Sequence, residues 1–189
     1  NRCGAQGKSP LVMPDTPPPR GFPNTEYEAR LVRAHEAMGA ARLDALLLTT
    51  EADIRYLSGF QTQFWQSPTR PWYLVVPKGA KPIAVIPQIG ETCMARGWIE
   101  DIRTWSSPHP TDDGVSLLCA TLKECTGRGG TVGAPLARET HLRMPVQAID
   151  ALRKALNFAD ASPVMRKLRM VKSEHEIAKI AHVCSLVSN

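Results

Sequence analysis

The sequence lacks the features that mark most membrane-spanning, secreted and zinc-ribbon proteins. No apolar run approaches the roughly 18 residues that a membrane helix needs, and the N-terminal stretch has no apolar segment typical of a secretory signal. The five cysteines are odd in number and include no C-x-x-C pair, so neither a disulfide framework nor a zinc ribbon is predicted. We therefore expect a cytoplasmic protein with reduced thiols and no membrane contact.

Strong charge of one sign is also missing. The net charge of +5 is spread along the chain, and hydrophobic residues make up 43% of it, which is typical of one globular domain with a real core. The densest basic stretch, residues 166–172, alternates with apolar residues. A solvated helix face or turn explains this stretch better than a nucleic-acid site, so no nucleic-acid partner is expected.

Motifs that carry catalysis are incomplete wherever they begin. No G-x-S-x-G elbow occurs. The Gly7-Lys8-Ser9 run is similar to a phosphate-binding loop, but Arg2 stands where the first glycine belongs and prolines follow. The glycine-rich run 127–133 has the wrong spacing for a dinucleotide fingerprint and leads into a strand. We therefore predict no catalytic residue and no cofactor in this chain.

Metal-ligand spacing is incomplete as well. His175 is followed by Glu176, as in zinc-protease helices, but Lys179 stands where the second histidine belongs. His182 could share a helix face with His175, which leaves a two-histidine site as an alternative without a third ligand. The pair Asp112 and Asp113 is better explained as capping a helix that starts near residue 115. The prediction is that this chain holds no metal site.

Strands and helices alternate along the rest of the sequence. Short apolar runs predict strands at 44–49, 72–76, 83–86, 102–105, 131–134 and 157–159. Helical spacing predicts helices at 25–38, opened by a capping box of Thr25 and Glu28, and at 52–57, 91–96, 115–126 and 142–156. Strands 72–76 and 83–86 form a hairpin. The predicted fold class is a layered α/β domain, with a mixed β-sheet flanked by helices on both faces.

The two ends of the chain differ from this α/β region, which spans residues 24–172. Residues 1–23 are rich in proline and predict an extended arm. Residues 173–189 begin a helix with a second capping box, Ser173 and Glu176, followed by an apolar stripe. Such a stripe needs a partner surface. Either it folds back on the domain or, as we prefer, it faces a further domain.

One segment has the composition of a contact surface. Six aromatic residues fall between residues 55 and 73, interleaved with amides, hydroxyls and Arg70. Residues 61–71 show no clean period and are predicted to form a loop. Aromatic rings beside polar groups in a loop favour recognition. The alternative is a loop folded over the domain's own core, with Phe64 and Trp65 buried.

Two motifs resemble a known family. Residues 56–60 read YLSGF after the strand 44–49 and resemble the YLTGF element of creatinase and prolidase N-terminal domains. Residues 169–177 read RMVKSEHEI and resemble the junction that leads into the catalytic domain of those enzymes. The hairpin 72–86 fits the same pattern. The resemblance covers about residues 24–187, and the order and spacing of the motifs carry it.

The resemblance has several implications. The family includes Xaa-Pro aminopeptidases, prolidases and creatinases, whose C-terminal domain binds two divalent metal ions (Mn, Co or Zn) in the peptidases. The ligands belong to that domain, so this chain is expected to be the non-catalytic N-terminal domain of such a hydrolase. Its expected partners are its own C-terminal catalytic domain and a second copy in a homodimer. The expected substrate-binding residues are Tyr56, Phe60, Trp65 and Arg70, with Arg70 pairing with a substrate carboxylate.

Other functions stay open from the sequence. Related domains occur in non-enzymatic proteins, so a stand-alone protein-binding module is the alternative. A small independent enzyme, built from side chains that only the fold brings together, is a third. Proline peptides, creatine and other amides are all candidate substrates of the parent.

Overall fold

The computed structural model describes residues 17–67 and 70–188, without the side chain of residue 188. Most of the predicted N-terminal arm therefore lies outside the described residues. The chain forms two compact units. The larger unit is Pro23–Val171, and the smaller one joins the N-terminal residues up to Phe22 with those from Lys172 onward.

A six-stranded sheet organises the larger unit, in the order β4-β3-β2-β1-β5-β6. Its strands are β1 (Ala45–Leu48), β2 (Tyr73–Pro77), β3 (Ile83–Pro87), β4 (Asp101–Trp105), β5 (Thr131–Ala134) and β6 (Asn157–Asp160). β2 pairs antiparallel with both β1 and β3, and the remaining pairs are parallel. The mixed sheet and the β2–β3 hairpin are therefore confirmed.

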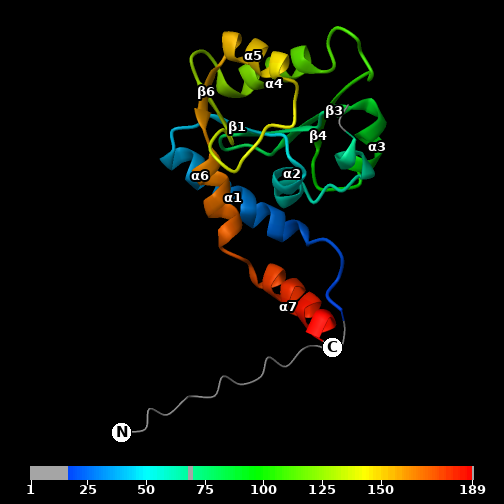
Figure 1. Ribbon diagram of the computed structural model, residues 1–189. Coiled ribbons are helices and arrows are strands. Elements are labelled where there is room, and N and C mark those ends of the chain that lie inside the picture. Colours follow the sequence, from blue (N-terminus) through cyan, green and yellow to red (C-terminus); the bar gives the residue numbers. More distant parts are fainter. Residues whose placement is uncertain (1–16, 68–69, 189) are drawn as a thin grey trace. The chain divides into compact units, whose positions relative to one another are not determined.

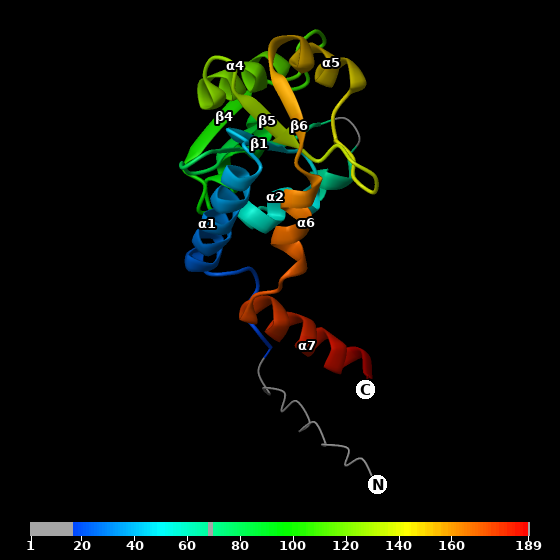
Figure 2. The same ribbon diagram turned by 90° about the vertical axis from the view of Figure 1, so that its left-hand side faces the viewer.

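Helices cover both faces of this sheet (Figure 1). On one face lie α4 (Val115–Thr126) and α5 (Val146–Ala155), and on the other α1 (Asn24–Ala40), α2 (Glu51–Ser58) and α6 (Ser162–Met170). The short helices η2 (Gln88–Gly90) and α3 (Glu91–Met94) lie between β3 and β4 in sequence. The view turned by 90° shows the same two helical layers (Figure 2). The predicted layered α/β class is confirmed.

Strand β1 shows why its sequence is apolar throughout. Its side chains alternate between the faces, so Ala45 and Leu47 join the core beneath α4 and α5, while Leu46 and Leu48 point the other way. All four residues are fully buried, because each face of the sheet carries a helical layer. Burial of each leucine side chain stabilises the fold by about 1.5–3 kcal/mol.

The start of α1 differs from the prediction. The helix begins at Asn24 with Pro23 as its N-cap and no side-chain cap, so the capping box of Thr25 and Glu28 is wrong. The Pro23 carbonyl accepts the Glu26 amide at 3.0 Å instead. Proline is tolerated at this position because a residue before the helix needs no N–H for an intrahelical hydrogen bond.

The helices α6 and α5 also differ in part from the prediction. Residues 166–170 of the basic stretch belong to α6, so the predicted helix face is confirmed for them, whereas Val171 and Lys172 follow the helix. Its apolar residues Val164, Met165 and Leu168 are buried, whereas its cationic residues are exposed. Leu142 lies outside α5, which begins only at Val146 after Pro145.

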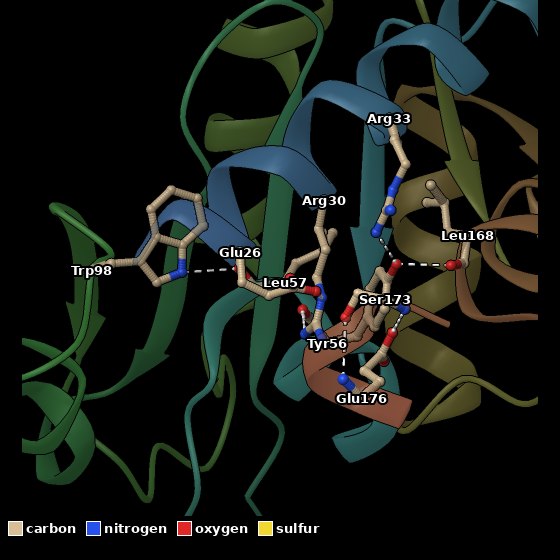
Figure 3. Close-up of polar contacts among 9 residues, drawn as sticks. All are labelled: Glu26, Arg30, Arg33, Tyr56, Leu57, Trp98, Leu168, Ser173 and Glu176. Atoms are coloured by element: carbon tan, nitrogen blue, oxygen red, sulfur yellow. Dashed lines mark hydrogen bonds and ion pairs between the residues drawn. The ribbon is translucent and has the colours of Figure 1, made fainter. Parts of the chain in front are cut away.

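The smaller unit contains α7 (Glu174–Ser188). The capping box at its start is confirmed: the Ser173 amide donates to Glu176 Oε2 at 2.9 Å, and the Glu176 amide donates to Ser173 Oγ at 3.2 Å (Figure 3). Lys179 Nζ donates to the Pro19 carbonyl and lies 5.0 Å from the Phe22 ring centre. The predicted apolar stripe of α7 includes Ile177, Ile180 and Val187, which are exposed, as are the apolar residues Val183 and Leu186 of the same helix. Among the helices that the structure describes, none is long and apolar enough to cross a membrane.

Candidate functional site at the carboxyl edge of the sheet

Five of the six strands have their carboxyl ends at the same edge of the sheet. The pairings make β1, β3, β4, β5 and β6 run in one direction and β2 in the other. Five carboxyl ends therefore lie at this edge, beside Tyr73 at the start of β2. In open α/β sheets, ligands bind outside the carboxyl ends of the strands. The segment between α2 and β2, which holds the aromatic residues, lies at this edge.

Four aromatic rings of that segment pack against one another. The Trp72 ring centre lies 5.4 Å from that of Phe60, 6.0 Å from that of Trp65 and 6.2 Å from that of Phe64. Phe60, Trp65 and Trp72 are buried, and Phe64 is half-buried. A short 3-10 helix, η1 (Gln63–Gln66), carries two of these rings, and Thr62 Oγ1 accepts the Phe64 amide at 3.3 Å. Phe60, Trp65 and Trp72 therefore belong to the domain's own core, which confirms the alternative for Trp65, whereas Phe64 is only half-buried.

Arg70 lies at the outer side of this aromatic cluster. Its guanidinium carbon is 5.4 Å from the Phe64 ring centre, a cation–π arrangement, and the residue is half-buried. Phe60, Trp65 and Arg70, three of the four predicted site residues, are thus brought into one cluster. Of these three, Arg70 alone carries a charge.

The fourth predicted residue, Tyr56, has its partners in the helical layer of α1 and α6. Its hydroxyl donates to the Leu168 carbonyl at 2.7 Å and accepts from Arg33 Nη2 at 3.1 Å (Figure 3). The Arg30 guanidinium lies 4.4 Å from its ring centre, and Arg30 Nη1 donates to the Tyr56 carbonyl at 2.8 Å. The side chain is only 7% exposed. In the structure, Tyr56 therefore joins α1, α2 and α6.

Sequence reasoning missed Arg143, which also reaches the aromatic cluster. It precedes α5, and its guanidinium carbon lies 5.9 Å from the Trp65 ring centre. Its Nη1 donates to the Arg70 carbonyl at 2.7 Å, and its Nη2 donates to the carbonyls of Phe64, at 3.3 Å, and Ser67. No local motif marks this arginine, because its partners lie more than 70 residues earlier in the chain.

Burial shapes the electrostatics of this edge. Desolvation lowers the pKa of the Arg143 guanidinium, against the opposing influence of Tyr73. Desolvation also raises the pKa of Tyr73, and the nearby Asp113 adds to the rise. At neutral pH the site therefore combines an uncharged tyrosine with two arginines.

The acidic and histidine residues singled out in the sequence form no metal centre. Within residues 17–67 and 70–188, no group of three or more His, Cys, Asp or Glu side chains could hold a metal ion. The N-cap of α4 is Gly114 and not an aspartate, but Asp112, two residues earlier, accepts the Ser116 amide at 3.0 Å and so caps the first turn. Asp113 differs from the prediction, since it accepts Trp105 Nε1 at 2.8 Å. His175 is exposed on α7.

The fold and the matched sequence together define the class. The mixed sheet between two layers of helices is a fold that this chain shares with a solved prolidase structure. The model of the creatinase/prolidase N-terminal domain matches residues 30–171, and the chain belongs to this family.

Named relatives agree with this family. The probable dipeptidase PepE of Mycobacterium tuberculosis is 29% identical over 164 residues, which cover 84% of this chain and 40% of the relative. The crystal structure of dipeptidase PepE from Mycobacterium ulcerans superposes with a TM-score of 0.65 at 25% identity and covers 83% of this chain and 40% of that one. This chain thus spans about 40% of the length of the curated relatives that it matches.

A further solved structure has about the length of this domain. The structure of a Creatine_N superfamily domain of a dipeptidase from Streptococcus thermophilus covers 74% of this chain and 98% of that chain. Its TM-score is 0.56 and its identity 14%, so the likeness concerns the fold alone.

Proposed function

We propose that this chain is the non-catalytic N-terminal domain of a dipeptidase-type hydrolase. In this proposal it contributes one wall of the substrate pocket and part of a homodimer contact. The observation that carries the proposal is the family match over residues 30–171 in a chain that spans only 40% of its curated relatives. The rest of such a protein would supply the catalytic groups.

The proposal places the metal chemistry of such a hydrolase outside this chain. The resemblance implies two divalent metal ions, which supply Lewis-acid chemistry to a peptidase. The described residues do not fit such ions, since they contain no suitable cluster of ligands. We therefore place the metal centre in the C-terminal domain and assign no chemical step to this chain.

The pocket wall is proposed at the carboxyl edge of the sheet. In this proposal the buried rings of Phe60 and Trp65 form the apolar layer behind the wall, and Arg70 pairs with the carboxylate of a peptide substrate. A guanidinium suits this partner because its parallel N–H groups match the two carboxylate oxygens. Tyr56 supports the wall indirectly, since it anchors α2, which leads into the aromatic segment.

Activity measurements on two forms of the protein test this function. The complete gene product and this 189-residue chain are assayed with Xaa-Pro dipeptides and with creatine, each with added Mn²⁺ or Co²⁺. Hydrolysis by the complete product alone is the expected result. Hydrolysis by the chain itself would overturn the proposal and direct attention to His175, His182 and the pair Asp112 and Asp113.

The role of Arg70 has its own test in the complete protein. Arg70→Ala should raise KM for a free-acid dipeptide about tenfold, the loss expected when a hydrogen bond to a charged group is removed. The same peptide with an amidated C-terminus serves as the control, because it lacks the carboxylate. An unchanged kcat/KM for the free acid would remove the assignment.

A further inference from the structure

Arg143 connects two distant parts of the chain at the proposed pocket wall. It lies between β5 and α5, and its backbone amide donates to Thr49 Oγ1 at 2.8 Å. Thr49 follows β1 directly and is 1% exposed. The backbone of Arg143 is therefore fixed to the central strand of the sheet, and its side chain extends from a rigid base.

The hydrogen bonds of the Arg143 side chain to the aromatic segment all go to main-chain carbonyls. Its guanidinium donates to the carbonyls of Phe64, Ser67 and Arg70, which lie within seven residues of one another. Carbonyl oxygens have the same chemistry whatever side chain follows them. These hydrogen bonds therefore fix the path of the backbone, and the guanidinium also lies 5.9 Å from the ring centre of Trp65.

The charge of Arg143 is balanced by dipoles. Among the described residues no carboxylate forms an ion pair with Arg143. Burial disfavours the charged form, as the lowered pKa indicates. Planar donors in a fixed fork can serve several carbonyls at once, which the point charge of a lysine does less well.

We propose that Arg143 is a positioning residue for substrate binding. It holds the backbone at Arg70 and Phe64, and so keeps the Arg70 guanidinium over the Phe64 ring, where it meets the substrate carboxylate. This inference rests on the proposed function of Arg70. Arg143 itself acts through Arg70 and through the order of the segment.

Hydrogen exchange in the complete protein tests the structural half of the inference without any substrate. The Ser67 amide donates at 3.0 Å to the Phe64 carbonyl, which Arg143 also contacts. Arg143→Ala should speed amide exchange in the peptide covering residues 60–72 and leave α4 unchanged. Arg138→Ala is the matched control, since Arg138 is exposed, carries the same charge and lies in the same connection between β5 and α5. Equal exchange in both variants would overturn the inference.

A double-mutant cycle tests the functional half. Arg143→Ala should raise KM for a free-acid dipeptide about tenfold with kcat little changed, because it disorders a group that bonds the charged substrate. In an Arg70→Ala background the same substitution should have no further effect, since coupled residues are not additive. Arg143→Lys should give a KM between those of the native protein and Arg143→Ala, and Arg138→Ala should have the KM of the native protein. Additive effects of Arg143→Ala and Arg70→Ala would refute positioning through Arg70.

The two measurements also separate this inference from the proposed function. Suppose that Arg70→Ala leaves KM unchanged while Arg143→Ala still speeds amide exchange in residues 60–72. The assignment of Arg70 to the substrate pocket then fails, and the role of Arg143 is limited to stabilising the backbone of the aromatic segment. The positioning role for substrate is then overturned. If Arg70→Ala raises KM and Arg143→Ala does not, the pocket assignment stands and Arg143 is excluded from it.

Discussion

Gly59→Ala should destabilise the larger unit more than an ordinary glycine substitution. Gly59 is the C-cap of α2, with φ of 70°, and its amide donates to the Arg55 carbonyl at 2.8 Å. An added Cβ would lie 2.1 Å from the hydroxyl oxygen of Tyr27 and 2.6 Å from its Cζ. Tyr27 is 6% exposed and stacks on Trp98 with ring centres 5.8 Å apart. The ring cannot yield without disturbing that stack.

The expected magnitude has two parts. A left-handed conformation costs a residue with a Cβ about 1–2 kcal/mol, offset in part by the reduced freedom of the unfolded chain, about 0.4–1 kcal/mol. Forcing an extra methyl group into packed structure costs a further ~1–3 kcal/mol. We expect Gly59→Ala to lower the free energy of unfolding by about 2–4 kcal/mol.

Gly79→Ala isolates the backbone part. Gly79 lies in the turn between β2 and β3 with φ of +78°, and an added Cβ meets nothing within 4 Å. Its substitution should cost about 1 kcal/mol or less. Urea unfolding of the 189-residue chain, followed by far-UV circular dichroism, measures both variants. Losses that agree within about 0.5 kcal/mol would refute the reasoning, because the contact with Tyr27 would then contribute nothing.

The remaining predictions concern a buried hydroxyl and a carboxylate cap. Tyr56→Phe should lower the free energy of unfolding by about 1–2 kcal/mol, because it removes the hydrogen bond to Leu168. Tyr73→Phe is the control in the same urea titration and should be nearly neutral, since the buried Tyr73 hydroxyl meets no partner within the described residues; a larger loss there than at Tyr56 would contradict the assignment. The Ser116 amide lowers the pKa of Asp112, so the stabilisation is complete above about pH 4 and is lost as pH falls through the lowered pKa. Unfolding measured from about pH 4 downward should depend less on pH in Asp112→Asn than in the native chain, and an identical dependence would exclude Asp112 as a contributor.

The fold class could be predicted because its signals are local. Apolar runs bounded by turns located all six strands to within a residue or two, and the turn at residues 77–82 identified the hairpin. The capping box of Ser173 and Glu176 formed because its two partners are three residues apart. The structure explains why the YLSGF element contains a glycine. Its left-handed cap and the Tyr27 ring both exclude a Cβ at Gly59.

The composition of the candidate site was also visible in the sequence, but its division of roles was not. Phe60, Trp65 and Arg70 lie together because they share one segment. Tyr56 lies only a few residues before them, yet its hydroxyl bonds Leu168, a residue 112 positions away. The direction in which a helical side chain points depends on the elements packed around it, and these are set by the whole fold.

By itself, the sequence determined the alternation of strands and helices, the family resemblance and the aromatic segment, because each depends on residues close together in the chain. Only the tertiary structure decided that Arg143 binds three carbonyls of that segment and that Tyr56 joins α1, α2 and α6. No local pattern in the sequence identifies the partners of either residue. The parallel pairing of β1 with β5 and the packing of α1 against α2 and α6 determine these partners. Both arrangements bring residues that are far apart in sequence within hydrogen-bond distance.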